Sequence, residues 1–181
     1  MCAMSTELAA RVPDSAPAAA SRASADDPAL GSWRAFIHAH AKLTRRLDEE
    51  LQAAHGLSLA EYDALLQLAR TPERRLRMSM LADRVLLSRS GITRLVDRLV
   101  ADGTVMRTAC PTDARGAEAA LTPIGLDRLR AASRTHLAGV QRYFLDAVGD
   151  VDGAAIERGL SRVIETVGGP ATDSHCDSTG V

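Results

Sequence analysis

Between residues 79 and 122 the hydrophobic periodicity changes from helical to alternating and back, which constrains the fold more than any other feature of the sequence. A helix of barely two turns, Met80 to Leu86, is followed by a tight turn and a second helix from Ser88 to about Ala101. Two extended segments then flank the turn-rich residues 111–116, a pattern that predicts a β-hairpin. Two helices joined by a tight turn and followed by a hairpin predict a winged helix-turn-helix.

Helical patterns also lie on both sides of this region. Ser58 and Glu61 form a capping box at the start of one helix, and Thr122 with Pro123 begins another. The expected flanking helices are residues 32–55, 58–71, 123–148 and 152–167, with a short extended segment at 75–78. The first helix and the last two carry apolar stripes. The helix-turn-helix and its hairpin are too small to cover them. Burial of these stripes between two chains predicts a homodimer with twofold symmetry. The fold class is therefore mainly α with a small β-hairpin wing, flanked by N- and C-terminal dimerisation helices.

Composition limits the ordered part of the chain to one domain. Residues 1–29 are rich in Ala, Ser, Pro and Asp, and the end from Gly168 is similar, so we expect a disordered arm at 1–29 and a disordered tail at 168–181. The ordered domain then spans 30–167, with the winged helix-turn-helix lobe at about 58–122. No stretch approaches the roughly 20 apolar residues of a membrane span, and no signal peptide is evident. Three scattered cysteines fit a reducing compartment, so we expect a cytoplasmic protein without a bound metal or cofactor.

Positive charge is concentrated in one third of the chain, although the formal net charge is only -1. Residues 74–130 contain eleven arginines, no lysine and six acids, a balance of +5. Such an asymmetry is typical of an anion-binding face, and a solvated Arg-rich surface without a special role is the alternative.

The second helix of the pair presents polar and cationic residues opposite its apolar side. A helix of this kind fits the major groove of DNA and presents its N-terminal half to the base edges. Arginine pairs bidentately with guanine, while serine and threonine bind a base or a phosphate. The alternative is an exposed helix in an ordinary bundle. The polar face comprises Arg89, Ser90, Thr93, Arg94, Asp97 and Arg98.

The hairpin that follows has a basic tip, which makes it a wing able to reach DNA. Arg115 is expected to lie against the backbone or in the minor groove, where a narrow electronegative groove favours a guanidinium. Asp113 is expected to orient Arg115, because a carboxylate fixes the planar fork of the guanidinium. The alternative for this pair is an ordinary surface ion pair.

These motifs resemble the MarR (multiple antibiotic resistance) regulators. The resemblance covers about residues 33–167, and its most specific part is Asp-x-Arg-Gly at 113–116 followed by Leu-Thr-x-x-Gly at 121–125. It implies a homodimer that binds a pseudo-palindromic operator, in most cases as a repressor, with half-sites about 10 bp apart. It also implies Arg115 as the minor-groove residue and Asp113 as its orienting acid. The implied recognition-helix contacts are Ser88, Arg89, Ser90, Thr93, Arg94 and Arg98.

Many members of this family bind small aromatic ligands between the dimer helices and the DNA-binding lobe. Here the candidate ligand-binding residues are Trp33, His40 and Tyr62, with a purely structural core role as the alternative for each. Some relatives sense oxidants through a cysteine near the first helix, a position at which this chain has none. Cys110, at the start of the wing loop, leaves a redox-responsive regulator as an alternative, and a buried inert thiol as another.

Two other classes of function are weighed against regulation. An enzyme is disfavoured because the sequence has no phosphate-binding loop, nucleophile elbow or zinc-protease motif. A protein-interaction bundle does not need an Arg-rich hairpin. A non-specific DNA-coating protein is expected to be basic overall, and its preference for one site over random DNA is expected to be near one.

Overall fold

The structure, a computed structural model, describes residues 27–110 and 113–168, and for Ala29, Ala109, Cys110 and 113–116 it describes the backbone alone. Most of the expected arm and tail therefore lies outside the described residues. The chain divides into two units, Met1–His38 and Ala39–Val181. The first unit contains a short 3₁₀ helix at Pro28–Leu30 and the start of helix α1.

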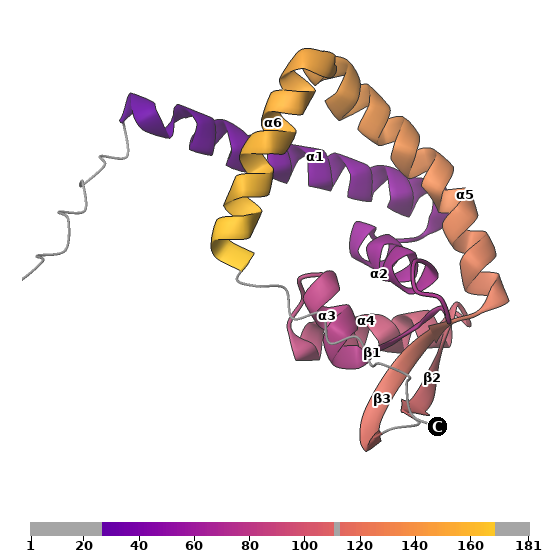
Figure 1. Cartoon of the computed structure of the whole chain (residues 1–181). Helices are drawn as coiled ribbons and strands as arrows, with labels where there is room; N and C mark the ends of the chain where they lie inside the picture. The colour runs from indigo at the N-terminus through magenta and orange to yellow at the C-terminus, as the bar shows by residue number, and fades with distance from the viewer. Residues whose placement is uncertain (1–26, 111–112, 169–181) are drawn as a thin grey trace, which may run out of the picture. The chain divides into compact units, whose positions relative to one another are not determined.

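The element order confirms the predicted fold class, with mostly helices and one small antiparallel sheet (Figure 1). The helices are α1 (Gly31–His55), α2 (Leu59–Ala69), α3 (Met78–Arg84), α4 (Arg89–Ala101), α5 (Pro123–Val140) and α6 (Asp146–Gly168). The strands are β1 (Arg75–Arg77), β2 (Val105–Cys110) and β3 (Asp113–Leu121). Within the described ranges, none of the helices combines the length and apolar character that a membrane span requires.

The capping signals in the sequence fix where α2, α4 and α5 begin. At α2 the Ser58 hydroxyl accepts a hydrogen bond from the Glu61 amide at 3.2 Å, and Glu61 Oε2 accepts one from the Ser58 amide at 3.0 Å. At α4 and α5 the Ser88 and Thr122 hydroxyls accept from the Gly91 and Gly125 amides, without the reciprocal carboxylate bond. Each such cap contributes about 1 kcal/mol, and the capping box predicted at Ser58 is confirmed.

Helix α3 begins at Met78, two residues before the predicted start at Met80. The reason is that β1 leads directly into the helix. Leu76 pairs with Ala119 of β3 and is buried, and Arg77 then serves as the N-cap without a side-chain hydrogen bond. The helix also ends at Arg84, two residues before the predicted Leu86.

The turn between α3 and α4 closes α3 with a pair of backbone hydrogen bonds. The Leu86 amide donates to the Asp83 carbonyl at 3.3 Å, and the Leu87 amide donates to the Ala82 carbonyl at 2.9 Å. This arrangement places the C′ residue in the left-handed region, where glycine is usual. Here the C′ residue is Leu86, with φ of 57°, a conformation that costs a leucine about 1–2 kcal/mol.

The sheet has the strand order β1-β3-β2, with both pairings antiparallel. Strands β2 and β3 form the predicted hairpin, but β3 begins at Asp113 rather than at the expected Ala117. The extension arises because the ladder continues past an irregularity at Ala109 and Cys110 to the pair Cys110 and Asp113. The hairpin therefore extends well beyond the core as a ribbon.

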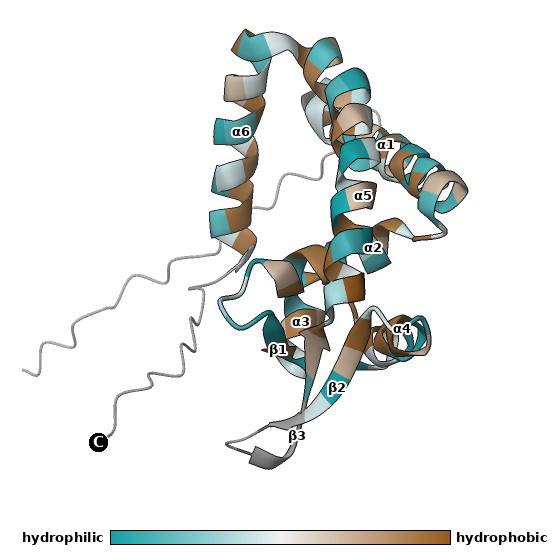
Figure 2. Cartoon of the chain, turned by 90° about the vertical axis from the view of Figure 1, so that its right-hand side faces the viewer, coloured by the Kyte–Doolittle hydropathy of each residue, from teal (hydrophilic) through white to brown (hydrophobic). Residues whose placement is uncertain are grey.

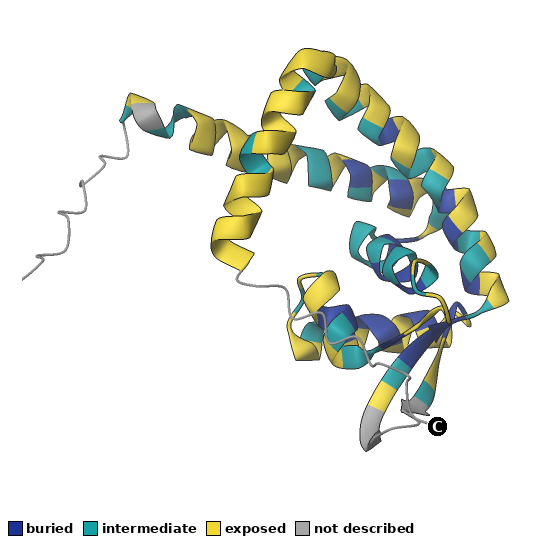
Figure 3. Ribbon diagram, viewed as in Figure 1, coloured by how far each residue is buried: buried dark blue, intermediate teal, exposed yellow. Residues whose placement is uncertain are grey.

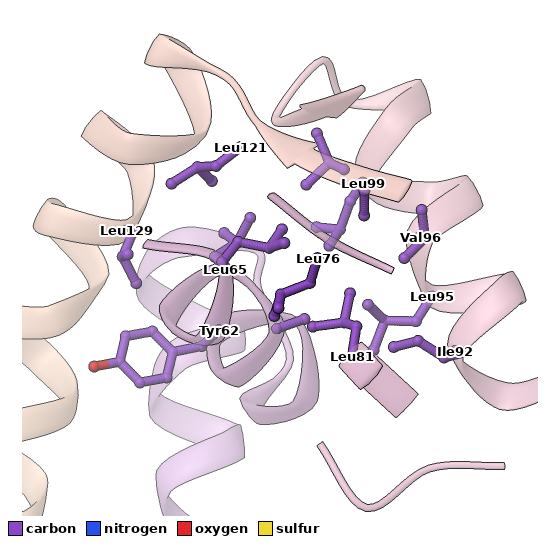
Figure 4. Close-up of a cluster of buried hydrophobic side chains, with 14 of the residues drawn as sticks. Tyr62, Leu65, Leu76, Leu81, Ile92, Leu95, Val96, Leu99, Leu121 and Leu129 are labelled. Atoms are coloured by element: carbon purple, nitrogen blue, oxygen red, sulfur yellow. The ribbon is translucent and has the colours of Figure 1, made fainter. Parts of the chain in front are cut away.

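The core lies where α2, α3, α4 and the base of the sheet meet the first half of α5 (Figures 3 and 4). It is almost entirely aliphatic, as the low aromatic content predicts, with Tyr62 as its aromatic member among the described residues. The largest fully buried side chains are Leu51, Leu57, Leu65, Leu68, Leu81, Ile92, Leu99, Val96, Val105 and Thr104.

Helix α5 is shorter than predicted. It ends at Val140, and a π-helical turn at Gln141–Leu145 leads into α6. The break expected between residues 148 and 152 is present inside α6, where Gly149 has φ of 70°. No side chain of α6 is buried, in contrast to the core helices (Figure 3).

Candidate nucleic-acid interface

Helix α4 has one buried face and one exposed polar face. The buried face packs into the core through Ile92, Leu95, Val96 and Leu99, each at most 2% exposed. Arg89, Thr93 and Arg94 are exposed, together with Ser88 and Ser90 at the helix start. The difference in hydropathy between the two faces can be followed in Figure 2. Burial of the apolar face thus fixes the direction in which the polar face points.

Hydrogen bonds within α4 hold its first turn rigid. The Ser88 hydroxyl accepts from the Gly91 amide at 3.1 Å and lies 3.2 Å from the Ser90 hydroxyl. The Thr93 hydroxyl donates to the Arg89 carbonyl at 2.8 Å. These hydroxyls are exposed, and their lone pairs can accept a hydrogen bond from a base amino group. Whichever of Ser88 and Ser90 accepts in their mutual hydrogen bond keeps an O–H that can donate to a phosphate.

Arg89 and Arg94 are the cations that this helix offers to a partner. Neither guanidinium forms an ion pair with any residue that the structure describes. Both lie in the N-terminal half of α4, where the helix dipole also favours an anion. Two guanidiniums that form no ion pair among the described residues, beside exposed hydroxyls, make this face suited to bind a polyanion.

Arg98 differs from the other two arginines because it is already paired. Its Nε donates to Glu61 Oε1 at 2.8 Å, and its Nη1 donates to the Arg94 carbonyl at 3.4 Å. Burial acts to raise the pKa of Glu61, but hydrogen bonds from Ser58 and Arg98 outweigh it, so the pKa lies below its ordinary value. Arg98 therefore connects α4 to the capped start of α2.

A second pairing connects α4 to the wing. Arg107 of β2 contacts Asp97 Oδ1 at 2.9 Å and donates to the Thr93 carbonyl at 3.3 Å. The sequence pattern alone does not single out Arg107, because its position opposite α4 depends on how the hairpin packs. Its place in a strand directly after the recognition helix was the available signal.

The wing residues lie on strand β3, and the structure describes their backbone alone. Asp113 is the first residue of β3 and pairs with Cys110 of β2, and Arg115 follows two positions later. The predicted contact between Asp113 and Arg115, and the environment of the Cys110 thiol, lie outside the described residues.

The three candidate ligand-binding residues occupy different places. His40 lines an open groove of about 540 Å³ together with Arg45, Asp48, Leu59, Asp63 and other residues of α1, α2 and the end of α3. The Tyr62 ring instead packs 4.5 Å from the His136 ring, with its hydroxyl 3.4 Å from Ser133. Trp33 belongs to the first unit, where its ring centroid lies 6.2 Å from that of Phe36.

His136, on α5, is a further titratable group of this region. Its ring is half-buried against Tyr62, and its Nδ1 has no hydrogen-bond partner among the described residues. Burial lowers the pKa of His136, and the nearby Asp63 only partly opposes that shift. The described residues contain no group of three or more His, Cys, Asp or Glu side chains arranged to hold a metal ion.

Comparison with known proteins connects this geometry to one family. Residues 55–116 match the model of the MarR family. Curated protein sequences give no match. The structure is similar to that of Sco3205, a MarR family transcriptional regulator from Streptomyces coelicolor in complex with DNA, with 33% identity and a TM-score of 0.73. That similarity covers 78% of this chain and 89% of the other.

Two further solved structures are similar. AbsC, a MarR family transcriptional regulator from Streptomyces coelicolor, has 31% identity and a TM-score of 0.71, covering 75% of this chain and 91% of that chain. A MarR family transcriptional regulator from Silicibacter pomeroyi has 30% identity and a TM-score of 0.63, covering 76% and 94%. The winged helix-turn-helix geometry and these relatives agree, and the chain belongs to the MarR family of transcriptional regulators.

Proposed function

We propose that the chain is a sequence-specific DNA-binding repressor that acts as a homodimer on a pseudo-palindromic operator. The observation that carries this proposal is the exposed face of α4, where Arg89 and Arg94 form no ion pair within the described residues. Because the operator is part of the genome, the proposed place of action of the protein is the cytoplasm. The structure of Sco3205 in complex with DNA supports the same assignment by similarity.

In this proposal the N-terminal half of α4 enters the major groove. Arg94 and Arg89 contact guanine edges or phosphates, while Ser88, Ser90 and Thr93 supply hydroxyls. Arg98 acts mainly through its contact with Glu61, which orients α4, and reaches DNA only at the edge of the interface. The wing places Arg115 in the minor groove, with Asp113 as its orienting acid.

Exposed apolar side chains on the last two helices support the homodimer. Leu137 on α5 is 61% exposed, and Ile164 on α6 is 67% exposed. A helix with a hydrophobic side and no buried residue gains stability only when another surface covers it. A twofold dimer matches the symmetry of a palindromic operator, with half-sites about 10 bp apart.

The groove lined by His40 is the place where we propose that a small aromatic ligand binds and releases the DNA. It joins α1 to α2 and to Val85 at the end of α3, so a bound ligand would act on the position of the helix-turn-helix. Asp48 in its wall already accepts a hydrogen bond from the Leu59 amide at 2.7 Å. His40 and Arg45 line the same groove, and an imidazole and a guanidinium are groups that bind a phenolate or carboxylate.

The experiment that tests the proposed function is competitive binding to an operator selected by the wild-type protein from random DNA. We expect the wild type to prefer the operator to random DNA by about 10³ or more. Arg94→Ala is expected to weaken operator binding by about 1–3 kcal/mol and to relax the sequence specificity. The same result is expected for Arg115→Ala. A preference near one for the wild type would contradict the proposal and favour a coating protein.

Arg130→Ala is the matched control. Arg130 is also an exposed arginine, but it lies on α5 and pairs with Asp127 at 3.1 Å. Its replacement changes net charge as much as Arg94→Ala does. If the two variants lose the same operator affinity, the effect is one of total charge, and the assignment of α4 is wrong.

A further inference from the structure

The turn between α3 and α4 exposes a large apolar side chain that the folded chain does not use. Leu86 is 90% exposed, the highest exposure among the large hydrophobic residues described. Its neighbours Val85 and Leu87 both pack against the core. Of the three consecutive apolar residues in this turn, only the middle one points into solvent.

The backbone at Leu86 is also strained. Its φ of 57° lies in the left-handed region, in which side chains with a Cβ are disfavoured. The end of α4 provides a comparison within the same chain. There the Gly103 and Thr104 amides donate to the carbonyls of Val100 and Leu99, and the left-handed position is taken by Gly103, with φ of 69°. The chain thus uses glycine at one such helix end and leucine at the other.

A strained and exposed leucine is disfavoured for the stability of the folded chain, both by its backbone and by its lack of apolar burial. Residues kept in sparsely populated backbone conformations cluster at functional sites such as active sites, ligand clamps and switch regions. The surroundings of Leu86 indicate the kind of partner. Arg84 and Arg89 are exposed on either side and form no ion pair within the described residues, and Asp83 is the single acid among these neighbours.

We propose that Leu86 is a DNA-contacting residue that rests on the apolar surface of the operator at the N-terminal edge of the recognition helix. The apolar groups that DNA offers at this place are the thymine 5-methyl in the major groove and the deoxyribose ring. This inference rests on the proposed function. It adds an apolar contact to an interface otherwise built from cations and hydroxyls.

Leu86→Gly separates this role from a structural one, because the melting temperature and the operator affinity are expected to change in opposite directions. Glycine removes the strain and the exposed side chain, so the melting temperature of the free protein is expected to rise by about 2–4 °C. Operator affinity is expected to fall about fivefold to tenfold, or about 1–1.4 kcal/mol. A merely structural role predicts a change in melting temperature with unchanged affinity.

The measurement is fluorescence anisotropy of the full-length protein on the selected operator, with wild type, Leu86→Gly and Ile124→Ala. Ile124, which is 65% exposed at the start of α5, controls for the loss of an exposed apolar side chain. Operator binding by Leu86→Gly as tight as by wild type, or a loss matched by Ile124→Ala, would overturn the inference while leaving the proposed function intact. Failure of the wild type to prefer any operator would overturn both.

A second operator with deoxyuridine in place of thymine identifies the group contacted. If Leu86 contacts a thymine methyl, wild type loses affinity on the substituted operator and Leu86→Gly does not. If it contacts deoxyribose, wild type binds both operators equally and Leu86→Gly remains weaker on both. A change of oligomeric state in Leu86→Gly would instead assign the side chain to a contact between protein copies and overturn the inference.

Discussion

At the scale of single residues, Gly125 shows how a short motif ties the recognition lobe to α5. A Cβ at this position would lie 2.0 Å from the Thr104 carbonyl oxygen and 2.8 Å from Leu121 Cδ1. The Thr122 hydroxyl donates to the Gly103 carbonyl at 2.8 Å and accepts from the Gly125 amide at 3.0 Å. The Leu-Thr-x-x-Gly pattern is therefore a packing requirement at the base of the wing.

Gly125→Ala is expected to lower the free energy of unfolding by about 3 kcal/mol, since the atom it meets is backbone and overpacking costs about this much. Urea denaturation measures the change. Gly159→Ala is the matched control, because a Cβ on Gly159 of α6 meets nothing within 4 Å. Replacement of that helical glycine is expected to stabilise the protein by about 0.5–1 kcal/mol. Equal effects of the two substitutions would contradict this packing account.

His136 gives the stability a defined dependence on pH. Its pKa is lowered by burial in the folded state, so below its ordinary value of 6.5 the unfolded chain binds a proton that the folded chain resists. The free energy of unfolding is thus expected to fall as pH decreases from 6.5 toward the lowered pKa, and to be insensitive to this group above 6.5.

His136→Phe keeps a ring against Tyr62 and removes the titration. Chemical denaturation between pH 7.5 and 5.5 is expected to show a smaller loss of stability for this variant than for wild type. This window lies above the range in which Glu61 acts, because the lowered pKa of Glu61 removes stability only below about pH 4.5. Identical pH profiles for wild type and variant would show that His136 does not titrate in this way.

At the level of secondary-structure elements, two ion pairs hold the C-terminal half of the recognition helix against its neighbours. Arg98 connects it to α2 and Arg107 connects it to β2. The Arg107 and Asp97 side chains are 39% and 56% exposed, so their pair contributes at most about 1 kcal/mol to stability. Its larger effect is expected on the angle between α4 and the wing, which both contact the operator in the proposed complex.

Arg107→Ala is therefore expected to weaken operator binding several-fold while the melting temperature changes little. Asp97→Asn should give a similar loss, and the double variant should lose less than the sum of the two. Anisotropy titrations of the four proteins form the cycle. Additive losses would mean that Arg107 acts on DNA directly and does not position the wing through Asp97.

The elements themselves were largely predictable because caps and hydrophobic period are local signals. Ser58, Ser88 and Thr122 marked three helix starts correctly. The start of α3 and the extent of β3 were missed, because both depend on strand pairing with residues distant in sequence. The polar face of α4 could likewise be predicted from its own sequence. The pairing of Arg98 with Glu61 could not, because it depends on how α2 packs against α4.

For the whole molecule, the proposed mode of operator binding depends on the assembly of two copies. Helix α6 buries none of its side chains, not even its apolar ones. Its residues Val163, Ile164 and Val167 are all more than half exposed. The core is complete without them, so these residues are available to a second copy. In the proposed dimer, two α4 helices bind one operator.

Ile164→Asp is expected to shift the protein toward monomer and to weaken operator binding strongly, because a charge at an apolar interface is costly. Light scattering at micromolar concentration measures the mass. Glu157→Ala, a change on the same helix at an exposed charged residue, is the control. A variant Ile164→Asp that remains dimeric would place the interface elsewhere.

Dimethyl sulfate footprinting of the operator tests whether α4 occupies the major groove. Methylation at guanine N7 reports occupation of the major groove. We expect two protected patches about 10 bp apart, one for each α4, with protection reduced by Arg94→Ala and retained by Arg130→Ala. A bound operator whose guanine N7 atoms all remain reactive would contradict the claim that α4 reads the major groove.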